Sequence, residues 1–138
     1  MPTDLRLAIV VNPELPLGLI ANTVGAIAIG LGAKRPDLGN ATLADREGHA
    51  IDISSNRPVP ILAADAATLN AVLGKALSRD GGCALVAFPA FARALHDYRD
   101  YETTFPDRNL DEEVIDGIGL AGPTRWVRSL TGSLRLLR

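Results

Sequence analysis

Residues 5–32 read LRLAIVVNPELPLGLIANTVGAIAIGLG, and this stretch decides the fold. Its first part, residues 5–11, is a short apolar run rich in β-branched residues, which is typical of a strand buried on both faces. Residues 12–16 contain two prolines and predict a connecting loop. From Leu17 the residues are small or aliphatic and carry no charge until Lys34, which predicts a buried, closely packed helix. Strand, tight loop and helix together predict the first unit of an α/β domain.

The rest of the chain alternates strand and helix patterns. The clearest helix is predicted at residues 65–78, where Asp65 is a suitable N-cap and the apolar residues follow a helical period. The pattern also predicts strands at 50–53, 59–63, 83–88 and 115–120, helices at 90–100 and 124–130, and a loop or irregular excursion at 34–48. Residues 1–138 are therefore expected to form a single α/β domain, with a mostly parallel or mixed sheet of about four strands and helices on both faces.

The composition is that of an ordinary soluble globule, with 47% apolar and 22% charged residues. The 14 basic and 16 acidic residues leave no basic surplus, so charge does not indicate a nucleic-acid partner. The single cysteine, Cys83, cannot form an internal disulfide, which fits a cytoplasmic location. The uncharged run 15–33 reaches membrane-spanning length only at the margin and holds four glycines and a proline, so we expect no membrane segment.

Two motifs that could carry a function are better explained by structure alone. Residues 117–122 match G-x-G-x-x-G, but the acidic residue expected about 20 positions later is missing, which favours close packing of a strand and a helix. Asp45, His49 and Asp52 match no established metal spacing and favour a solvated loop, so no metal or cofactor is expected. Asp116, near the end of an acidic segment, is expected on a solvated face.

A ligand site is expected where the first helix begins, because this point lies at the carboxyl end of the first strand. Asn22 and Thr23 are the polar pair of that helix. Either they bond to a neighbouring loop or they point into a pocket, and the sequence leaves both interpretations open. The candidate ligand-binding residues are Gly18, Asn22, Thr23, Asp45 and His49.

The two ends of the chain resemble the type II peptidyl-tRNA hydrolases. The resemblance lies in a strand followed by LPLGLIANTVGAIAIG (15–30) and in the ending GIGLAGPTRWVRSLTGSLRLL (117–137). The chain is still more similar to a family of uncharacterised bacterial proteins, through Asn22, the D-x-x-G loop 45–48, the P-V/I-P-x-L strand 58–62 and the L-T-G-S-L ending. This resemblance implies the type II peptidyl-tRNA hydrolase-like fold.

The resemblance does not extend to the active site. The catalytic-region lysines of the hydrolases correspond to Pro16 and Gly18, their glutamine to Asn22, their cysteine to Thr23 and their histidine to Gly25. A hydrolase needs a general base or a positioned water, and a charge that stabilises the oxyanion. None of these is present at the matching positions.

Three hypotheses follow. The first is a small-molecule or partner-binding domain without hydrolase chemistry. The alternative is a hydrolase of a tRNA-linked ester or amide that uses replacement residues, for which Asp45 and His49 are the candidates. The third is a homodimer in which the small residues of the first helix allow close approach of a second copy.

Overall fold

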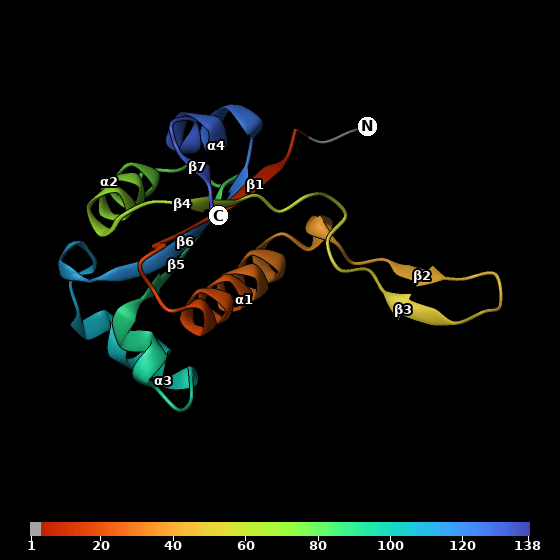
Figure 1. Cartoon of the computed structure of the whole chain (residues 1–138), viewed down its shortest axis with the longest axis horizontal. Coiled ribbons are helices and arrows are strands. Elements are labelled where there is room, and N and C mark those ends of the chain that lie inside the picture. The colour runs from red at the N-terminus through yellow and green to blue at the C-terminus, as the bar shows by residue number, and fades with distance from the viewer. Residues whose placement is uncertain (1–3) are drawn as a thin grey trace.

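The computed structural model describes residues 4–138, which form a mixed five-stranded sheet packed between helices (Figure 1). The strand order is β5-β6-β1-β4-β7. Only β1 and β4 run parallel within this sheet, and the other neighbouring pairs are antiparallel. The strands are β1 (Arg6–Val11), β4 (Ile61–Ala63), β5 (Ala84–Pro89), β6 (Ile115–Gly122) and β7 (Arg135–Leu136). The expected α/β class is confirmed, and the sheet is mixed rather than mostly parallel.

The helices divide between the two faces of the sheet. One face is covered by α1 (Leu17–Lys34), and the other by α2 (Ala66–Ala76) and α4 (Thr124–Thr131) (Figure 1). Asp65 caps α2 as expected, because its side chain accepts a hydrogen bond from the Thr68 amide. The short helix α3 (Arg99–Thr104) lies next to β5 and is joined to it by a hydrogen bond from the Tyr101 hydroxyl to the Ala87 carbonyl.

Strand β1 is buried on both faces, as the apolar run predicted. Leu7, Ile9 and Val11 belong to the core cluster beneath α1. Ala8 and Val10 belong to the cluster beneath α2 and α4. Because successive strand side chains point to opposite faces, one apolar strand supplies both halves of the core.

Glycines of β6 allow α1 to lie close to the sheet. A Cβ added to Gly117 would lie 2.8 Å from the Thr23 methyl group, and one added to Gly119 would lie 2.9 Å from Leu31 Cδ1. Side chains at these two positions would therefore hold α1 away from the sheet. This geometry supports the close-packing interpretation of the G-x-G-x-x-G motif.

Two expected elements are wrong. Residues 90–100 do not form one helix, because Ala90–Ala94 is a 3-10 turn (η2) and Leu95 is extended before α3 begins. The expected loop 34–48 instead contains a second 3-10 turn, Pro36–Leu38 (η1), and the strand β2 (Thr42–Ala44). The register pairs β2 with β3 (Ala50–Asp52) in a two-stranded hairpin outside the main sheet.

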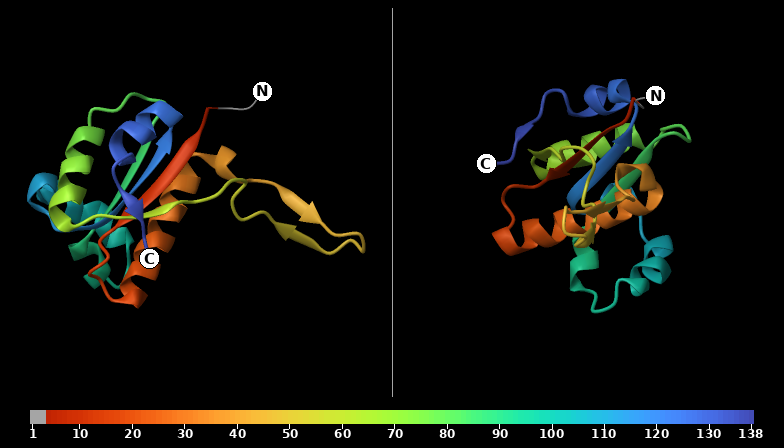
Figure 2. Two further views of the ribbon diagram at one scale, coloured as in Figure 1. Left: turned by 45° about the horizontal axis from the view of Figure 1, so that its top comes forward. Right: turned by 90° about the vertical axis from the view of Figure 1, so that its right-hand side faces the viewer.

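That hairpin projects from the body of the molecule (Figure 2). We refer to residues 41–52 as the arm, and every one of them is exposed. The arm leaves the body after η1, beyond the C-terminal end of α1 (Figure 1). Within residues 4–138, its two strands pair with each other and not with the main sheet.

The expectation that α1 is a buried helix is also wrong. Thr23, Ile27 and Leu31 are buried against the sheet, whereas the opposite face of α1 is exposed. That exposed face carries small residues at a spacing of three and four, namely Gly18, Ala21, Gly25, Ala28 and Gly32. In residues 4–138, α1 is the one helix long and apolar enough to cross a membrane by length and composition, and only 17% of that window is buried. Its packing on the sheet through three side chains is consistent with a soluble protein.

Candidate functional site

The start of α1 is tied to the segment that follows β5. Asn22 Nδ2 donates a hydrogen bond to the Tyr98 hydroxyl, with 3.2 Å between the two atoms. The Tyr98 ring contacts Phe88, with 5.7 Å between the ring centroids. Asn22 thus has a structural partner from a neighbouring loop, which was one of the two interpretations left open by the sequence.

The other candidates on α1 point in different directions. Thr23 is 1% exposed and packs against Gly117, so its side chain faces the sheet. Gly18 is exposed, and a Cβ added there would meet nothing within 4 Å. Gly18, Asn22 and Thr23 therefore share a helix start but do not line one pocket.

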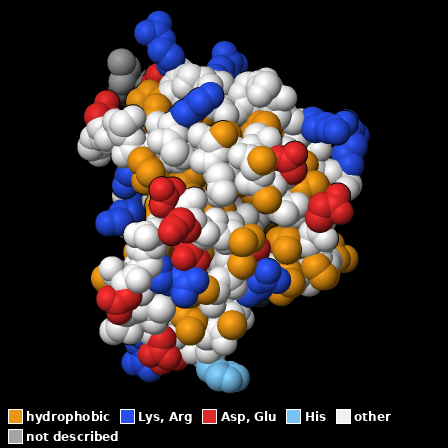
Figure 3. All heavy atoms as spheres, turned by 90° about the vertical axis from the view of Figure 1, so that its left-hand side faces the viewer, with side chains coloured by type: hydrophobic (Ala, Val, Ile, Leu, Met, Phe, Trp, Pro, Cys, Tyr) orange, Lys and Arg blue, Asp and Glu red, His pale blue; other side chains and the backbone are white. Residues whose placement is uncertain are grey.

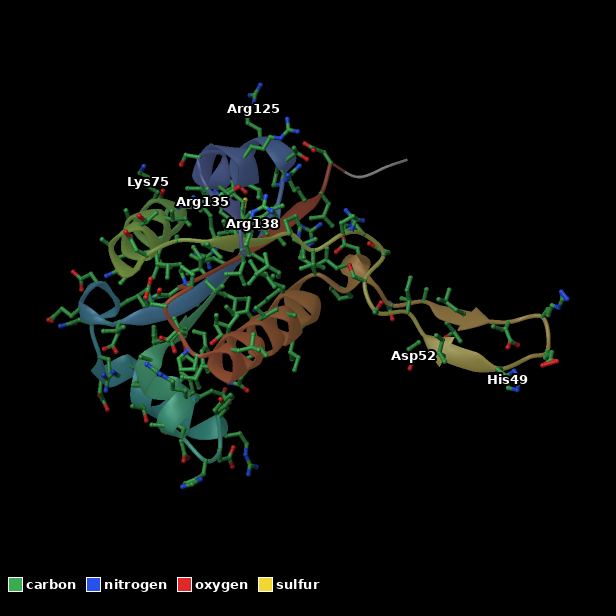
Figure 4. The ribbon with its side chains drawn as sticks, viewed as in Figure 1. His49, Asp52, Lys75, Arg125, Arg135 and Arg138 are labelled. Atoms are coloured by element: carbon green, nitrogen blue, oxygen red, sulfur yellow. The ribbon has the colours of Figure 1, made fainter. Side chains whose placement is uncertain are left out.

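Asp45 and His49 meet in the turn of the arm. His49 Nδ1 lies 2.8 Å from Asp45 Oδ2, and the other Asp45 oxygen accepts the backbone N–H groups of Glu47 and His49. The hydrogen bond with His49 is the main cause that lowers the pKa of Asp45. Figure 4 shows His49 on the projecting arm, well apart from α1. Within one chain, the structure does not bring this pair together with Gly18, Asn22 and Thr23.

Asp116 is buried rather than solvated, which corrects the sequence-based expectation. The residue is 1% exposed at the start of β6, and the Arg93 Nε atom lies 3.1 Å from its Oδ2 atom. Oδ2 accepts no hydrogen bond from the described residues. Burial raises the pKa of Asp116, and the nearby Arg93 opposes that rise. Sequence reasoning missed this ion pair because Arg93 and Asp116 lie 23 positions apart and meet only through the pairing of β5 with β6.

Neither Cys83 nor the candidate metal ligands show the features of a reactive or metal-binding site. Cys83 is half-buried, and burial is the main cause that raises the pKa of its thiol, so the thiolate form is disfavoured. Across residues 4–138, no three His, Cys, Asp or Glu side chains are grouped so that they could hold a metal ion. Asp52, the third member of the metal candidate set, stands opposite Thr42 in the arm.

An apolar cavity of about 620 Å³ lies beside the C-terminal half of α1. It is bounded by α1, η1, β1 and the segment that leads from the arm back to the sheet. Its apolar walls include Leu7, Ala28, Ile29, Leu31, Leu38 and Val59. The sequence did not reveal this cavity, because its walls come from four segments whose arrangement only the fold determines.

Arg35 contributes a charged side chain to the cavity wall, and its guanidinium group already forms hydrogen bonds within the protein. Arg35 donates from Nε and Nη2 to the two carboxylate oxygens of Asp37, and from Nη1 to the Gly82 carbonyl. The hydrogen bonds with Asp37 raise the pKa of Arg35. The remaining polar groups come from Asn40, Ser54 and Ser55. The cavity therefore offers an apolar lining and a few neutral hydrogen-bonding groups.

Residues 4–138 thus form an α/β domain with an apolar cavity beside α1. The chain belongs to the family described as "Protein of unknown function (DUF2000)", whose model matches residues 5–138. It is similar to the solved structure of a protein of unknown function from Agrobacterium tumefaciens strain C58, with a TM-score of 0.87 and 18% sequence identity. That similarity covers 98% of both chains and shows the shared fold. No curated protein matches this chain.

Proposed function

We propose that this protein binds a small, neutral and largely apolar molecule in the cavity beside α1, without carrying out hydrolase chemistry. The observation that carries the proposal is the cavity itself. Its volume of about 620 Å³ falls within the range typical of small-molecule sites, and such sites are mostly apolar with a few polar groups that fix orientation.

The polar groups in the wall define the class of ligand. Because Asp37 and Gly82 occupy the Arg35 guanidinium, an anionic ligand would have to displace a bidentate ion pair. A neutral ligand avoids that cost. Asn40 and Ser54 lie at exposed positions of the cavity wall and can orient one or two polar atoms of such a ligand.

The residues at the start of α1 support a function without hydrolase chemistry. The resemblance to type II peptidyl-tRNA hydrolases remains a prediction about the fold, and at the matching positions this chain has Pro16, Gly18 and Gly25. The ion pair of Arg93 and Asp116 lies near the end of β5, but its carboxylate is sealed from solvent. A sealed carboxylate cannot reach a substrate as a general base without local opening.

Binding can be tested with the neutral fluorescent probe N-phenyl-1-naphthylamine. We expect a saturable rise in fluorescence with the wild-type protein. Gly32 lines the cavity and has open space around its Cβ direction, so Gly32→Leu should fill the cavity and weaken binding by about tenfold or more. Gly74→Leu on α2 is the matched control, because Gly74 is also an exposed helical glycine with open space. Equal binding by the two variants, or no saturable binding by the wild type, would contradict the proposal.

The hydrolase alternative has one observation in its favour, namely the contact between Asp45 and His49. A carboxylate that orients a histidine is a common arrangement in general-base catalysis. Among the described residues, however, Asp45 is the one side chain hydrogen-bonded to His49. Peptidyl-tRNA hydrolysis by the wild type that is lost in both Asp45→Asn and His49→Ala would support this alternative. Hydrolysis that survives both changes, or none at all, would exclude it.

A further inference from the structure

We infer that a second copy of this chain docks on the exposed, uncharged face of α1, and that each copy's arm lies against the other copy. Two separate features of the structure lead to this inference. One is an arm with an apolar pair, and the other is an uncharged helix face, and no other part of residues 4–138 covers either of them. The inference goes beyond the proposed ligand site and does not depend on it.

The arm has an apolar face that is left exposed in the part of the chain that the structure describes. Leu43 and Ile51 stand directly opposite each other in the β2–β3 register, so both side chains lie on one face. They are 45% and 66% exposed. In residues 4–138, β2 and β3 pair only with each other. An isolated two-stranded hairpin is marginal in water and needs packing against another surface.

The outer face of α1 suits close approach of another helix. Its small residues, Gly18, Ala21, Gly25, Ala28 and Gly32, are neighbours along the helix surface because they are three and four positions apart. Two large apolar side chains flank this stripe, with Leu17 82% and Ile29 76% exposed. The helix carries no charge before Lys34. By contrast, Figure 3 shows acidic and basic side chains interspersed at the end of the molecule opposite the arm.

The absence of charge on this face fits a copy of the same helix as the partner. Because residues 17–33 carry no charged side chain, two copies of α1 can pack antiparallel about Gly25 without bringing like charges together. This is the self-complementary geometry of a twofold dimer.

The position of the arm fits the same arrangement. The arm leaves the body beyond the C-terminal end of α1 (Figure 1). An antiparallel partner places the N-terminal end of its own α1 at that point. The exposed Leu17 of one copy then lies opposite Ala33 of the other, near the point where the arm leaves the body, so the arm extends over the partner beyond that helix end.

The surface approaches the size of a standard interface. Each copy offers nine exposed positions of α1 before Lys34 and, on the face of the arm that carries Leu43 and Ile51, about half of its twelve exposed positions. A standard interface engages about 20 to 30 residues a side. The cavity borders the same end of α1, so the partner's helix start would lie near its opening.

The first experiment measures molar mass by light scattering and sedimentation velocity. We expect the wild type to be a dimer of 14.6 kDa chains at micromolar concentration. Gly25→Lys places a charge in the middle of the stripe, where a Cβ meets nothing within 4 Å, and should give a folded monomer. Gly74→Lys, a matched change on α2, should remain dimeric. A monomeric wild type, or a Gly25→Lys variant that stays dimeric, would overturn the inference.

A second experiment tests the role of the arm. The double change Leu43→Asp and Ile51→Asp places two charges on the apolar face of the arm and should shift the dimer toward monomer. The matched control is Ala44→Asp with Ala50→Asp on the opposite face of the arm, which should remain dimeric. A Leu43→Asp and Ile51→Asp variant that is as dimeric as this control would overturn the placement of the arm.

The dimer and the ligand site fail in distinguishable ways. A Gly25→Lys monomer that still binds the naphthylamine probe would leave the ligand proposal intact. A dimeric wild type that binds no probe would overturn the ligand proposal and support the dimer.

Discussion

Leu43 and Ile51 face each other across the arm as a directly paired apolar couple that no other part of residues 4–138 covers. In most small domains such a pair would belong to a core. Here it belongs to a hairpin that projects from the domain, so it adds little to the core of the monomer. This relationship is the basis of the proposed role of the arm in association.

The double change Leu43→Thr and Ile51→Thr should leave the stability of the monomer nearly unchanged. Threonine keeps the β-branched shape favoured in strands, and the lost side chains contact solvent rather than the core. In the monomeric Gly25→Lys background, the free energy of unfolding should change by no more than about 0.5 kcal/mol. Urea denaturation measures this. A loss of several kcal/mol would mean that the arm packs against its own domain.

Gly119→Ala should destabilise the protein by about 1 to 3 kcal/mol, because an added methyl group would overpack the space between β6 and α1. A Cβ at this position would lie 2.9 Å from Leu31 Cδ1 and closer still to Ile27 Cγ2. Gly74→Ala is the control and should stabilise by about 0.5 to 1 kcal/mol, since its Cβ meets open space within a helix. Thermal unfolding of both variants measures the contrast, and equal effects would refute the packing argument.

Arg93→Met should destabilise the protein at neutral pH by about 1 to 3 kcal/mol, because it leaves the buried Asp116 carboxylate without a charged partner. The loss should shrink at acidic pH, where Asp116 becomes protonated. The double variant Arg93→Met and Asp116→Asn should recover much of the stability at neutral pH. Denaturant titrations at several pH values measure all three, and an equal loss at every pH would contradict the explanation.

Asp116 also predicts the sign of a pH dependence in the wild type. Burial raises the pKa of its carboxyl group in the folded state above the unfolded value. The folded state therefore binds the proton more tightly, so this contribution to the free energy of unfolding is present at low pH and is lost as pH rises through the folded pKa. Asp116→Asn should lack this contribution. A stability difference between the two proteins that stays constant with pH would show that Asp116 does not titrate in this way.

Asn22→Leu distinguishes the cavity from the ligand site first expected at the start of α1. Asn22 is exposed, bonds to Tyr98 and does not line the cavity, so the variant should stay folded and bind the naphthylamine probe as the wild type does. Tyr98→Phe removes the same hydrogen bond from the other side and should behave likewise. If Asn22→Leu abolished binding, the ligand would occupy the helix start instead.

Local sequence patterns predicted the regular core elements well, because each pattern reports a local period. The apolar run at β1, the cap and stripe of α2 and the strand–helix order at the C-terminus all appear in the structure. The prediction of one helix over 90–100 is wrong, although the apolar residues there have helical spacing. Tertiary contacts of Phe88 and Tyr98 instead accompany a 3-10 turn and an extended Leu95.

The candidate site was less predictable than the fold. The sequence grouped Asn22 with Thr23, and the structure turns one to solvent and the other into the core. It also grouped Asp45 and His49 with the helix start, and the arm keeps them apart within one chain (Figure 4). Whether such residues meet depends on the path that the connecting loops take through space. The composition of a loop does not determine that path.

The sequence by itself determined the α/β class, the strand that supplies both halves of the core and the glycines that bring α1 onto the sheet. These follow from short-range periodicity and from side-chain size at single positions. Only the tertiary structure decided that the small residues of α1 face outward, that 41–52 forms a projecting arm and that Asp116 is sealed beside Arg93. The physical reason is that burial is a property of the assembled surface, and neighbours distant in sequence determine which face of an element meets water.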